Sequence, residues 1–212
     1  MGLLGKALKN KWKDLRGTSE PEDVVRVISS PSDLIEGDHF TCCFLPQKVI
    51  SHVATQVGAV HYEQFAEDDI KPVYALENEL IDEAYFYIDE NRQGHQRSTF
   101  MLPLLRDDVF KLFDNEAVAA IFDTDDMAHL PVISDDNTVL SPWIADLNTT
   151  YHQENFQQMY YLKKQDSEGE EADFYRLIND DGDKAIHIYI YEGGETEFYA
   201  VVHHDMSVIE AF

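Results

Sequence analysis

Cysteines, basic residues and long apolar runs are all scarce in this sequence, and each shortage excludes a class of protein. The only two cysteines, Cys42 and Cys43, are adjacent, and neighbouring strand residues point to opposite faces, so a disulfide framework is excluded. We expect both thiols to be reduced, as in the cytoplasm. No stretch of about 18 apolar residues and no secretory signal pattern occurs, so we expect a cytoplasmic protein without a membrane-spanning helix.

Positive charge is the second shortage, because 16 lysines and arginines stand against 41 aspartates and glutamates, for a formal net charge of −25. The phosphates of nucleic acids would be repelled by such a chain, so we expect no nucleic-acid partner. Cations and basic surfaces are the partners that this charge favours. An acidic mimic of nucleic acid is an alternative, although the acids fall mostly in turn-like segments, which indicates simple solvation.

One short segment breaks the acidic pattern at the start of the chain. Residues 3–16 have apolar and basic side chains at helical spacing, centred on different faces. The residues assigned to partner or membrane binding are Leu4, Lys6, Leu8, Lys9, Trp12, Lys13 and Arg16. We interpret 1–19 as a basic amphipathic segment and linker, and 20–212 as one globular domain, with a further division near residue 150 as an alternative.

Three roles remain open for the basic segment. It packs its apolar side on the body, it docks on an acidic patch of this or another copy, or it anchors reversibly on the anionic inner surface of a membrane. In the last case Trp12 would lie at the lipid interface.

The first half of the body predicts one hairpin and two helices. Residues 80–89 and 98–104 are strand-like around the turn 90–96, and Pro103 ends the second strand or places it at an edge. Residues 46–62 fit helix or strand. Residues 106–122 predict a single amphipathic helix, with Asp107 and Asp108 in its first turn. A further helix is predicted to begin at Ser141 and Pro142.

The second half predicts an antiparallel meander, because five strand-like segments alternate with acidic or glycine turns. These segments are 159–165, 173–179, 184–192, 196–202 and 206–212. A two-residue turn at Gly193-Gly194 would set Tyr189 opposite Phe198 and His187 opposite Ala200. We therefore expect an α+β fold that is β-rich, with antiparallel sheets, a C-terminal meander and two or three helices.

None of the chemistry-bearing motifs is convincing, so no catalytic residue and no cofactor is predicted. His203-His204-Asp205 has metal-ligand chemistry, but adjacent strand residues face opposite ways, which favours histidines at a strand end near solvent. The acids at 123, 125 and 126 lack the glycine and glutamate that close a calcium loop. The run 179–183 indicates a hairpin turn. We expect no tight zinc or calcium site.

The order of blocks in the second half resembles the YjfK-like family of small bacterial proteins. The resemblance rests on "AYFYIDENRQG", "FQQMYYLKK" and "FYRLINDDGDKAIHIYIYEGG", and covers residues 55–212. It implies an uncharacterised cytoplasmic bacterial protein and transfers no catalytic residue.

Binding is the function that these observations favour. We interpret the chain as a non-enzymatic soluble bacterial protein that binds a protein partner, a second copy, or the inner membrane surface through its basic segment. The first alternative is a hydrolytic or metal-dependent enzyme with a dispersed site. A concave pocket that joins His203 or His204 to a carboxylate of another strand would favour it. The second alternative is the nucleic-acid mimic.

Deleting residues 1–17 should leave a body that unfolds cooperatively. If the segment is a membrane anchor, the full-length chain should sediment with anionic vesicles at low salt, because each basic residue near such a surface contributes about 1 kcal/mol. The truncated chain should stay in the supernatant, and Trp12→Ala should weaken sedimentation. Unfolding of the truncated chain would instead mean that the segment packs on the body.

Overall fold

The computed structural model describes residues 33–42, 53–66, 69–77, 83–91, 93–122, 127–134, 149–162, 169–206 and 209–211. This part of the chain contains eleven strands in one antiparallel sheet and two short helices. The strands are β1 (His39–Cys42), β2 (Val53–Ala66), β3 (Asp69–Glu77), β4 (Ala84–Glu90), β5 (Gln96–Leu104), β6 (His129–Pro131), β7 (Thr150–Leu162), β8 (Glu170–Asn179), β9 (Lys184–Tyr191), β10 (Thr196–Asp205) and β11 (Ile209–Ala211). The helices are α2 (Arg106–Leu112) and α3 (Asn115–Ala120).

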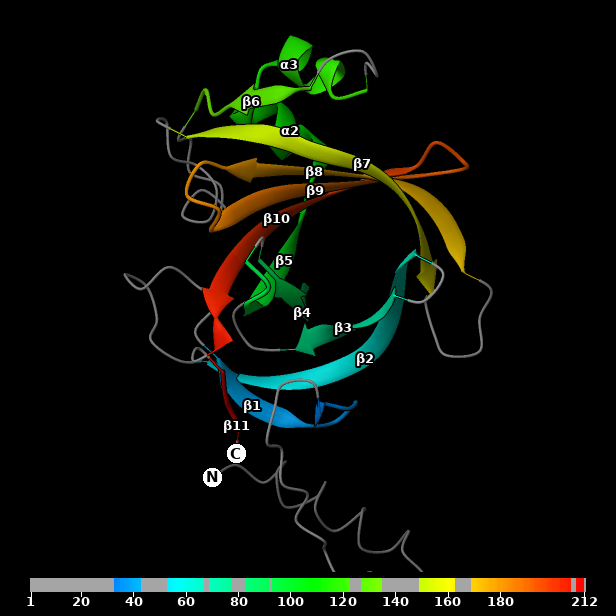
Figure 1. The fold of residues 1–212 in the computed structure, drawn as a ribbon, viewed down its shortest axis with the longest axis vertical. Coiled ribbons are helices and arrows are strands. Elements are labelled where there is room, and N and C mark those ends of the chain that lie inside the picture. The colour runs from blue at the N-terminus through cyan, green and yellow to red at the C-terminus, as the bar shows by residue number, and fades with distance from the viewer. Residues whose placement is uncertain are drawn as a thin grey trace, which may run out of the picture.

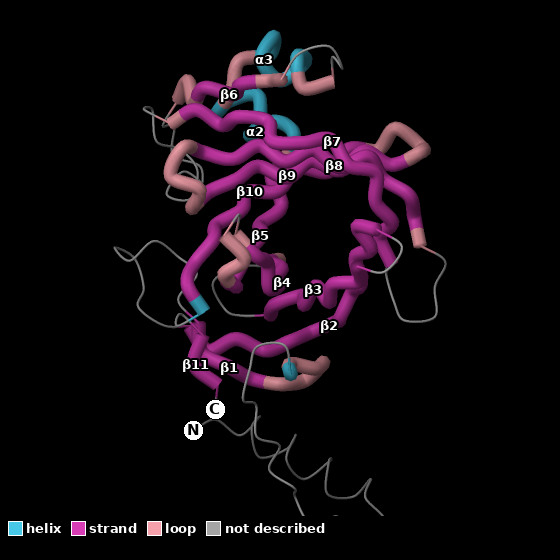
Figure 2. The backbone as a smooth tube through the Cα atoms, viewed as in Figure 1, coloured by secondary structure: helices cyan, strands magenta, loops and turns pink. Residues whose placement is uncertain are grey.

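The sheet closes on itself. Its order is β11-β1-β2-β3-β4-β5-β10-β9-β8-β7-β6, and the last residues of β2 pair in addition with the end of β7. Strands β2–β5 and β7–β10 therefore form a closed antiparallel cylinder, which Figures 1 and 2 show end-on. Among the described residues, each of these eight strands therefore has a partner on both sides, and the free edges of the sheet lie at β11 and β6.

Alternation along the strands divides the side chains between an inner and an outer face. Tyr189 of β9 donates a hydrogen bond to Glu63 of β2 at 3.3 Å, and these strands are not neighbours in the ring, so the contact crosses the interior. Tyr189 and the residues two positions away, His187 and Tyr191, thus face inward. The isoleucines between them face outward.

The larger apolar core lies outside the cylinder. At one side α2, α3 and β6 cover β7–β10 (Figure 1), and Phe113 packs edge-on against Tyr151 at 6.0 Å between ring centroids. At the other side, rings from four strands meet around Phe86, whose neighbours are Phe40 at 6.2 Å, Tyr74 at 5.9 Å and Phe100 at 5.1 Å. Burial of this apolar surface is the main driving force for covering the cylinder.

The segment predicted as one helix over 106–122 forms two. Phe113 is extended and bridges Val132, and Asp114 then caps α3, accepting hydrogen bonds from the backbone N–H of Glu116 at 2.8 Å and of Ala117 at 3.3 Å. A short acidic side chain that caps a new helix competes with continuation of the old one. Asp107 and Asp108 do lie in the first turn of α2, as predicted.

The predicted register of the β9–β10 hairpin is wrong by one residue. Phe198 pairs with Ile188 and Ala200 with Ile186, because the loop has three residues rather than two. The backbone N–H of Tyr191 donates to the carbonyl of Glu195 at 2.9 Å, and Gly194 adopts φ +80°, which favours glycine. One residue of slip exchanges the two faces of a strand.

The strand-rich, antiparallel prediction is otherwise confirmed. The hairpin over 80–104 appears as β4 and β5, with Pro103 next to the end of β5, although β5 lies between β4 and β10 rather than at an edge. The ambiguous segment 46–62 is strand from Val53. The turn at 179–183 joins β8 to β9. Among the described residues, no helix has the length and apolar character needed to cross a bilayer.

Two regions with further predictions lie outside the described residues. They are the basic N-terminal segment and the helix expected from Ser141. The same holds for Cys43 and for the acids at 123, 125 and 126.

Replacing Phe86 by alanine should lower the free energy of unfolding by about 3–5 kcal/mol, because its ring is fully buried among three others and a cavity would remain. Phe110→Ala is the matched control, since that ring is 38% exposed, and we expect a change within about 1 kcal/mol. Denaturant unfolding measures both. Equal losses in the two variants would contradict the packing described here.

Candidate functional site

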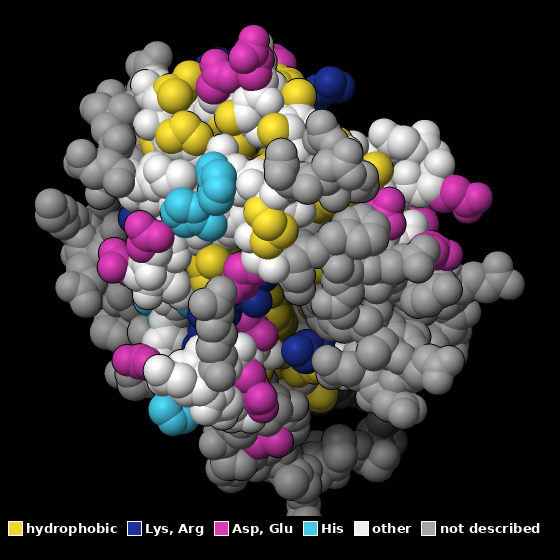
Figure 3. All heavy atoms as spheres, turned by 45° about the horizontal axis from the view of Figure 1, so that its top comes forward, with side chains coloured by type: hydrophobic (Ala, Val, Ile, Leu, Met, Phe, Trp, Pro, Cys, Tyr) yellow, Lys and Arg dark blue, Asp and Glu magenta, His cyan; other side chains and the backbone are white. Residues whose placement is uncertain are grey.

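The cylinder is hollow at one end. The hollow measures about 1170 Å³ and is bordered by the β4–β5 turn, the β8–β9 turn, the end of β10 and the beginning of β7. Figure 3 shows Lys or Arg side chains set among acidic and apolar ones within a depression of this surface. We call this space the mouth hollow. Its deeper lining includes Arg97, Glu154, Arg176 and His203.

A network of ion pairs forms the floor of the mouth hollow. Arg97 of β5 binds Asp89 of β4 through Nη2 at 2.8 Å and through Nε at 3.3 Å, and its Nη1 donates to the carbonyl oxygen of Gly182 at 3.2 Å. Asp89 and Arg97 are directly paired across the two strands. Both side chains are only 12% exposed, so the pair is largely shielded from water.

Arg176 connects this pair to the opposite wall. It lies on β8, four strands round the ring from β4, yet its Nη2 is 3.6 Å from Asp89 Oδ2. Its Nε is 3.4 Å from Glu154 Oε2 on the neighbouring β7. The two guanidinium groups and two carboxylates therefore balance in charge and tie four strands together across the interior.

The pKa of Asp89 shows which influence prevails in the network. Burial by itself would raise this pKa, but the hydrogen bond from Arg97 and the charges of Arg176 and Arg97 together lower it below the usual value. Asp89 is thus an anion in the folded protein at neutral pH.

The sequence predicted His203 at a strand end near solvent, but this residue is buried beside the network. It is 6% exposed, its Nδ1 is 3.0 Å from Thr99 Oγ1, and its Nε2 is 3.4 Å from Arg176 Nη2. Burial and the charges of Arg97 and Arg176 lower its pKa to about 2. The imidazole is therefore neutral. The expectation that its neighbour points the other way is confirmed, since His204 packs against Phe100 on the outer face at 6.1 Å.

His187 is a second neutral imidazole inside the cylinder. It is 1% exposed and stands edge-on to Phe174, with ring centroids 5.0 Å apart. Neither ring nitrogen has a hydrogen-bond partner among the described residues. Burial, followed by the charge of Arg176, lowers its pKa well below the usual value. A charged imidazole at this position would be strongly disfavoured.

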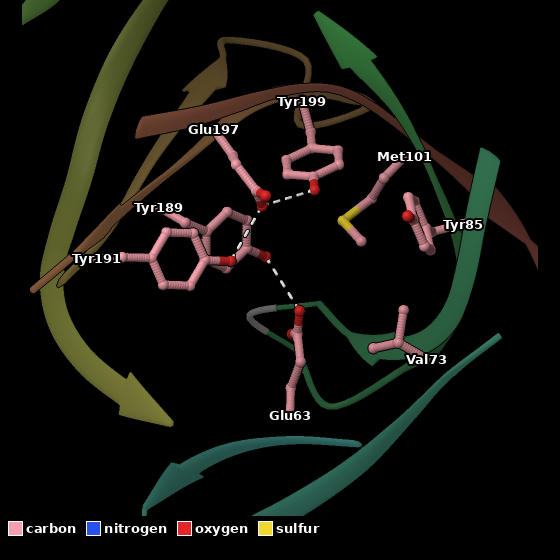
Figure 4. Close-up of a pocket in the computed structure, with 8 residues that line it drawn as sticks. All are labelled: Glu63, Val73, Tyr85, Met101, Tyr189, Tyr191, Glu197 and Tyr199. Atoms are coloured by element: carbon pink, nitrogen blue, oxygen red, sulfur yellow. Dashed lines mark hydrogen bonds between the residues drawn. The ribbon is translucent and has the colours of Figure 1, made fainter. Parts of the chain in front are cut away.

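Deeper in the cylinder, tyrosines surround two carboxylates (Figure 4). Tyr191 and Tyr199 donate to Glu197 at 3.0 Å and 2.8 Å, while Tyr189 donates to Glu63. The space left between these side chains is about 10 Å³, which is room for about one water molecule. This inner chamber is too small for an organic ligand.

Glu63 is the exceptional group of the inner chamber. It is 2% exposed, and its Oε2 has no hydrogen-bond partner among the described residues. Burial raises its pKa to about 7, against the opposing effects of the Tyr189 hydrogen bond and the charge of Lys71. Glu63 is therefore partly protonated at neutral pH.

The chemistry available in the mouth hollow is that of binding. The Thr99–His203 contact has the spacing of a nucleophile and its base, but the imidazole faces a guanidinium instead of an orienting carboxylate. A proton taken by His203 would be repelled by Arg176. In the described part of the chain, no three His, Cys, Asp or Glu side chains converge to hold a metal ion.

The seven residues assigned to binding from the sequence all lie outside the described residues: Leu4, Lys6, Leu8, Lys9, Trp12, Lys13 and Arg16. The network residues Asp89, Arg97 and Arg176 were missed, because they belong to no motif. The available signal was a charged residue within an apolar strand, as in "FYRLIN", where Arg176 falls on the same face as Phe174.

Comparison with protein-family models, with curated proteins and with solved structures found no match. The resemblance to the YjfK-like family stays a prediction.

Replacing Glu63 by glutamine should change how stability depends on pH. The folded-state pKa of about 7 lies above the usual value of 4.5 for a glutamate, so the contribution of Glu63 to wild-type stability is complete below about pH 4.5 and falls as pH rises toward 7. The loss amounts to about 3 kcal/mol, at 1.36 kcal/mol for each pKa unit. Relative to wild type, the Glu63→Gln variant should gain up to this amount between about pH 4 and pH 8.

Urea unfolding across this pH range measures the difference. Glu195→Gln is the control, because Glu195 is exposed in the β9–β10 turn. A constant offset between the Glu63→Gln variant and wild type at every pH would contradict the raised pKa.

Proposed function

We propose that this chain acts by binding, and that the mouth hollow holds a small organic cation such as a polyamine. The observation that carries the proposal is the charge of the lining. Six carboxylate side chains border the hollow against two guanidinium groups: Glu90, Glu154, Asp180, Asp181, Asp183 and Asp205 against Arg97 and Arg176. Carboxylates gathered on the wall of a concave, shielded space concentrate cations there.

The two arginines do not offset this excess at the rim. Their guanidinium groups face Asp89 and Glu154, so the charges on the floor of the hollow largely cancel. Asp181 and Asp205 are exposed at the entrance and remain available to an incoming ammonium group. The size of the hollow suits a flexible amine rather than a metal ion.

The enzyme alternative receives less support. From the sequence, we expect an enzyme to have a concave pocket that joins His203 or His204 to a carboxylate of another strand. His203 does line the mouth hollow. Its contacts, however, are Thr99 and Arg176, and its low pKa makes it a poor base.

Several finer assignments from the sequence are kept as proposals. They are the α+β class with a third helix, a bacterial cytoplasmic protein, and the basic N-terminal segment as a contact for a protein partner or anionic membrane. The amphipathic spacing of that segment supports the last of these.

Calorimetric titration of the full chain with spermidine at low salt tests the cation proposal. We expect one-site binding that weakens as salt is added, because exposed charges are screened. The double variant D181N/D205N should lower the affinity roughly tenfold, since each lost charge contact is worth up to about 1 kcal/mol.

The matched control is E192Q/E195Q, which removes two exposed charges at the opposite end of β9. It should bind as wild type does. Equal weakening in both double variants would mean that only net charge attracts the amine. Binding of succinate or inorganic phosphate in place of spermidine would assign the hollow to anions.

A further inference from the structure

Two histidines meet beside the mouth hollow, and one of them, His152, lines it. His129 of β6 lies directly opposite His152 of β7 in the antiparallel register. Their Nδ1 atoms are 2.8 Å apart, and the rings stand edge to face with centroids 4.9 Å apart. Figure 3 shows histidine side chains gathered in one patch above the depression. Neither residue takes part in the ion-pair network.

A carboxylate contacts the His152 ring at the nitrogen that points away from His129. Asp180, in the β8–β9 turn, has Oδ1 3.2 Å from His152 Nε2. When His152 Nε2–H donates to this oxygen, the lone pair of the ring lies on Nδ1, which is the atom that faces His129. A carboxylate behind an imidazole in this manner orients histidine ligands at metal sites and makes them more basic.

The 2.8 Å separation of the two nitrogens is that of a hydrogen bond, and it is also compatible with binding of both nitrogens to one metal ion. Nitrogens bound at about 2.0 Å to one ion lie about 2.8 Å apart when they subtend a right angle, and about 3.3 Å apart in a tetrahedron. The observed 2.8 Å matches neighbouring positions of a square or octahedral complex. Among imidazole-binding ions, copper(II) has this tetragonal preference and the highest affinity of the divalent series.

We propose that His129 and His152 bind one copper(II) ion through their Nδ1 atoms, with Asp180 as a positioning residue. His129 is exposed and the His152 side chain is 40% exposed, so water can occupy the other coordination positions. Without the ion, the Nδ1–H of His129 donates to His152. On binding, that proton moves through water to the exposed Nε2 of His129, and both lone pairs then face the ion.

The copper proposal shares His152 and Asp180 with the lining of the mouth hollow, but it rests on the histidine pair and not on the excess of carboxylates. It also agrees with the expectation that no tight zinc site exists, because zinc prefers the tetrahedral spacing.

Titration of the full chain without an affinity tag tests the proposal, with copper(II) followed by electron paramagnetic resonance. We expect one copper per chain with a signal typical of two imidazole nitrogens. His129→Gln and His152→Gln should each remove this species. Asp180→Asn should weaken it roughly 10- to 100-fold, as loss of such partners does elsewhere.

His95→Gln is the matched control, because His95 is exposed in the β4–β5 turn and should leave the signal unchanged. Thermal unfolding without metal checks that each variant is folded, and copper should raise the melting temperature of wild type but not of the His129→Gln variant. The same copper signal in wild type and in the His129/His152 double variant would overturn the proposal. Zinc bound as tightly as copper would overturn the tetragonal geometry.

Discussion

Closure of the sheet between β2 and β7 is the constraint on which the rest of the structure depends. Once the eight strands form a ring, every second side chain must enter a confined interior or pack against the outer layers. In this chain most of the buried apolar side chains lie on the outer face of the ring, where they pack under α2, α3 and β6 and around Phe86. The interior therefore receives the charged, imidazole and phenol groups.

Burial imposes pairing on those interior groups, because an isolated charge removed from water is strongly disfavoured. Asp89 satisfies this condition by contacting both Arg97 on the next strand and Arg176 on the opposite wall. Such a network adds little net stability compared with apolar side chains, but losing one member leaves a partner uncompensated. Its physical effect is to define how the strands are placed relative to one another. Glu63, without an arginine, retains its proton to higher pH instead.

The same arrangement separates a charge-balanced floor of the mouth hollow from a negatively charged entrance. Charge is balanced on the floor of the mouth hollow and is in excess at its entrance, so attraction of a cation depends on the rim. The rim is formed by turns, which can vary without disturbing the closed sheet. The histidine pair lies beside this rim, where one extra strand, β6, brings His129 beside His152.

The sequence by itself determined the local structure and the overall charge. Alternating aromatic strands such as β4, the turn at 179–183 and the acidic surface follow from residue types that act over a few positions. Both faces of β9 are largely apolar, however, so alternation alone could not tell inside from outside. A loop one residue longer than expected changed the cross-strand partners of Tyr189 and His187, from Phe198 and Ala200 to Glu197 and Tyr199. The contacts of Arg97 with Gly182 and of Tyr189 with Glu63 join residues 85 and 126 positions apart. Only tertiary structure decided these, because they arise from closure of the ring and leave no spacing pattern along the chain.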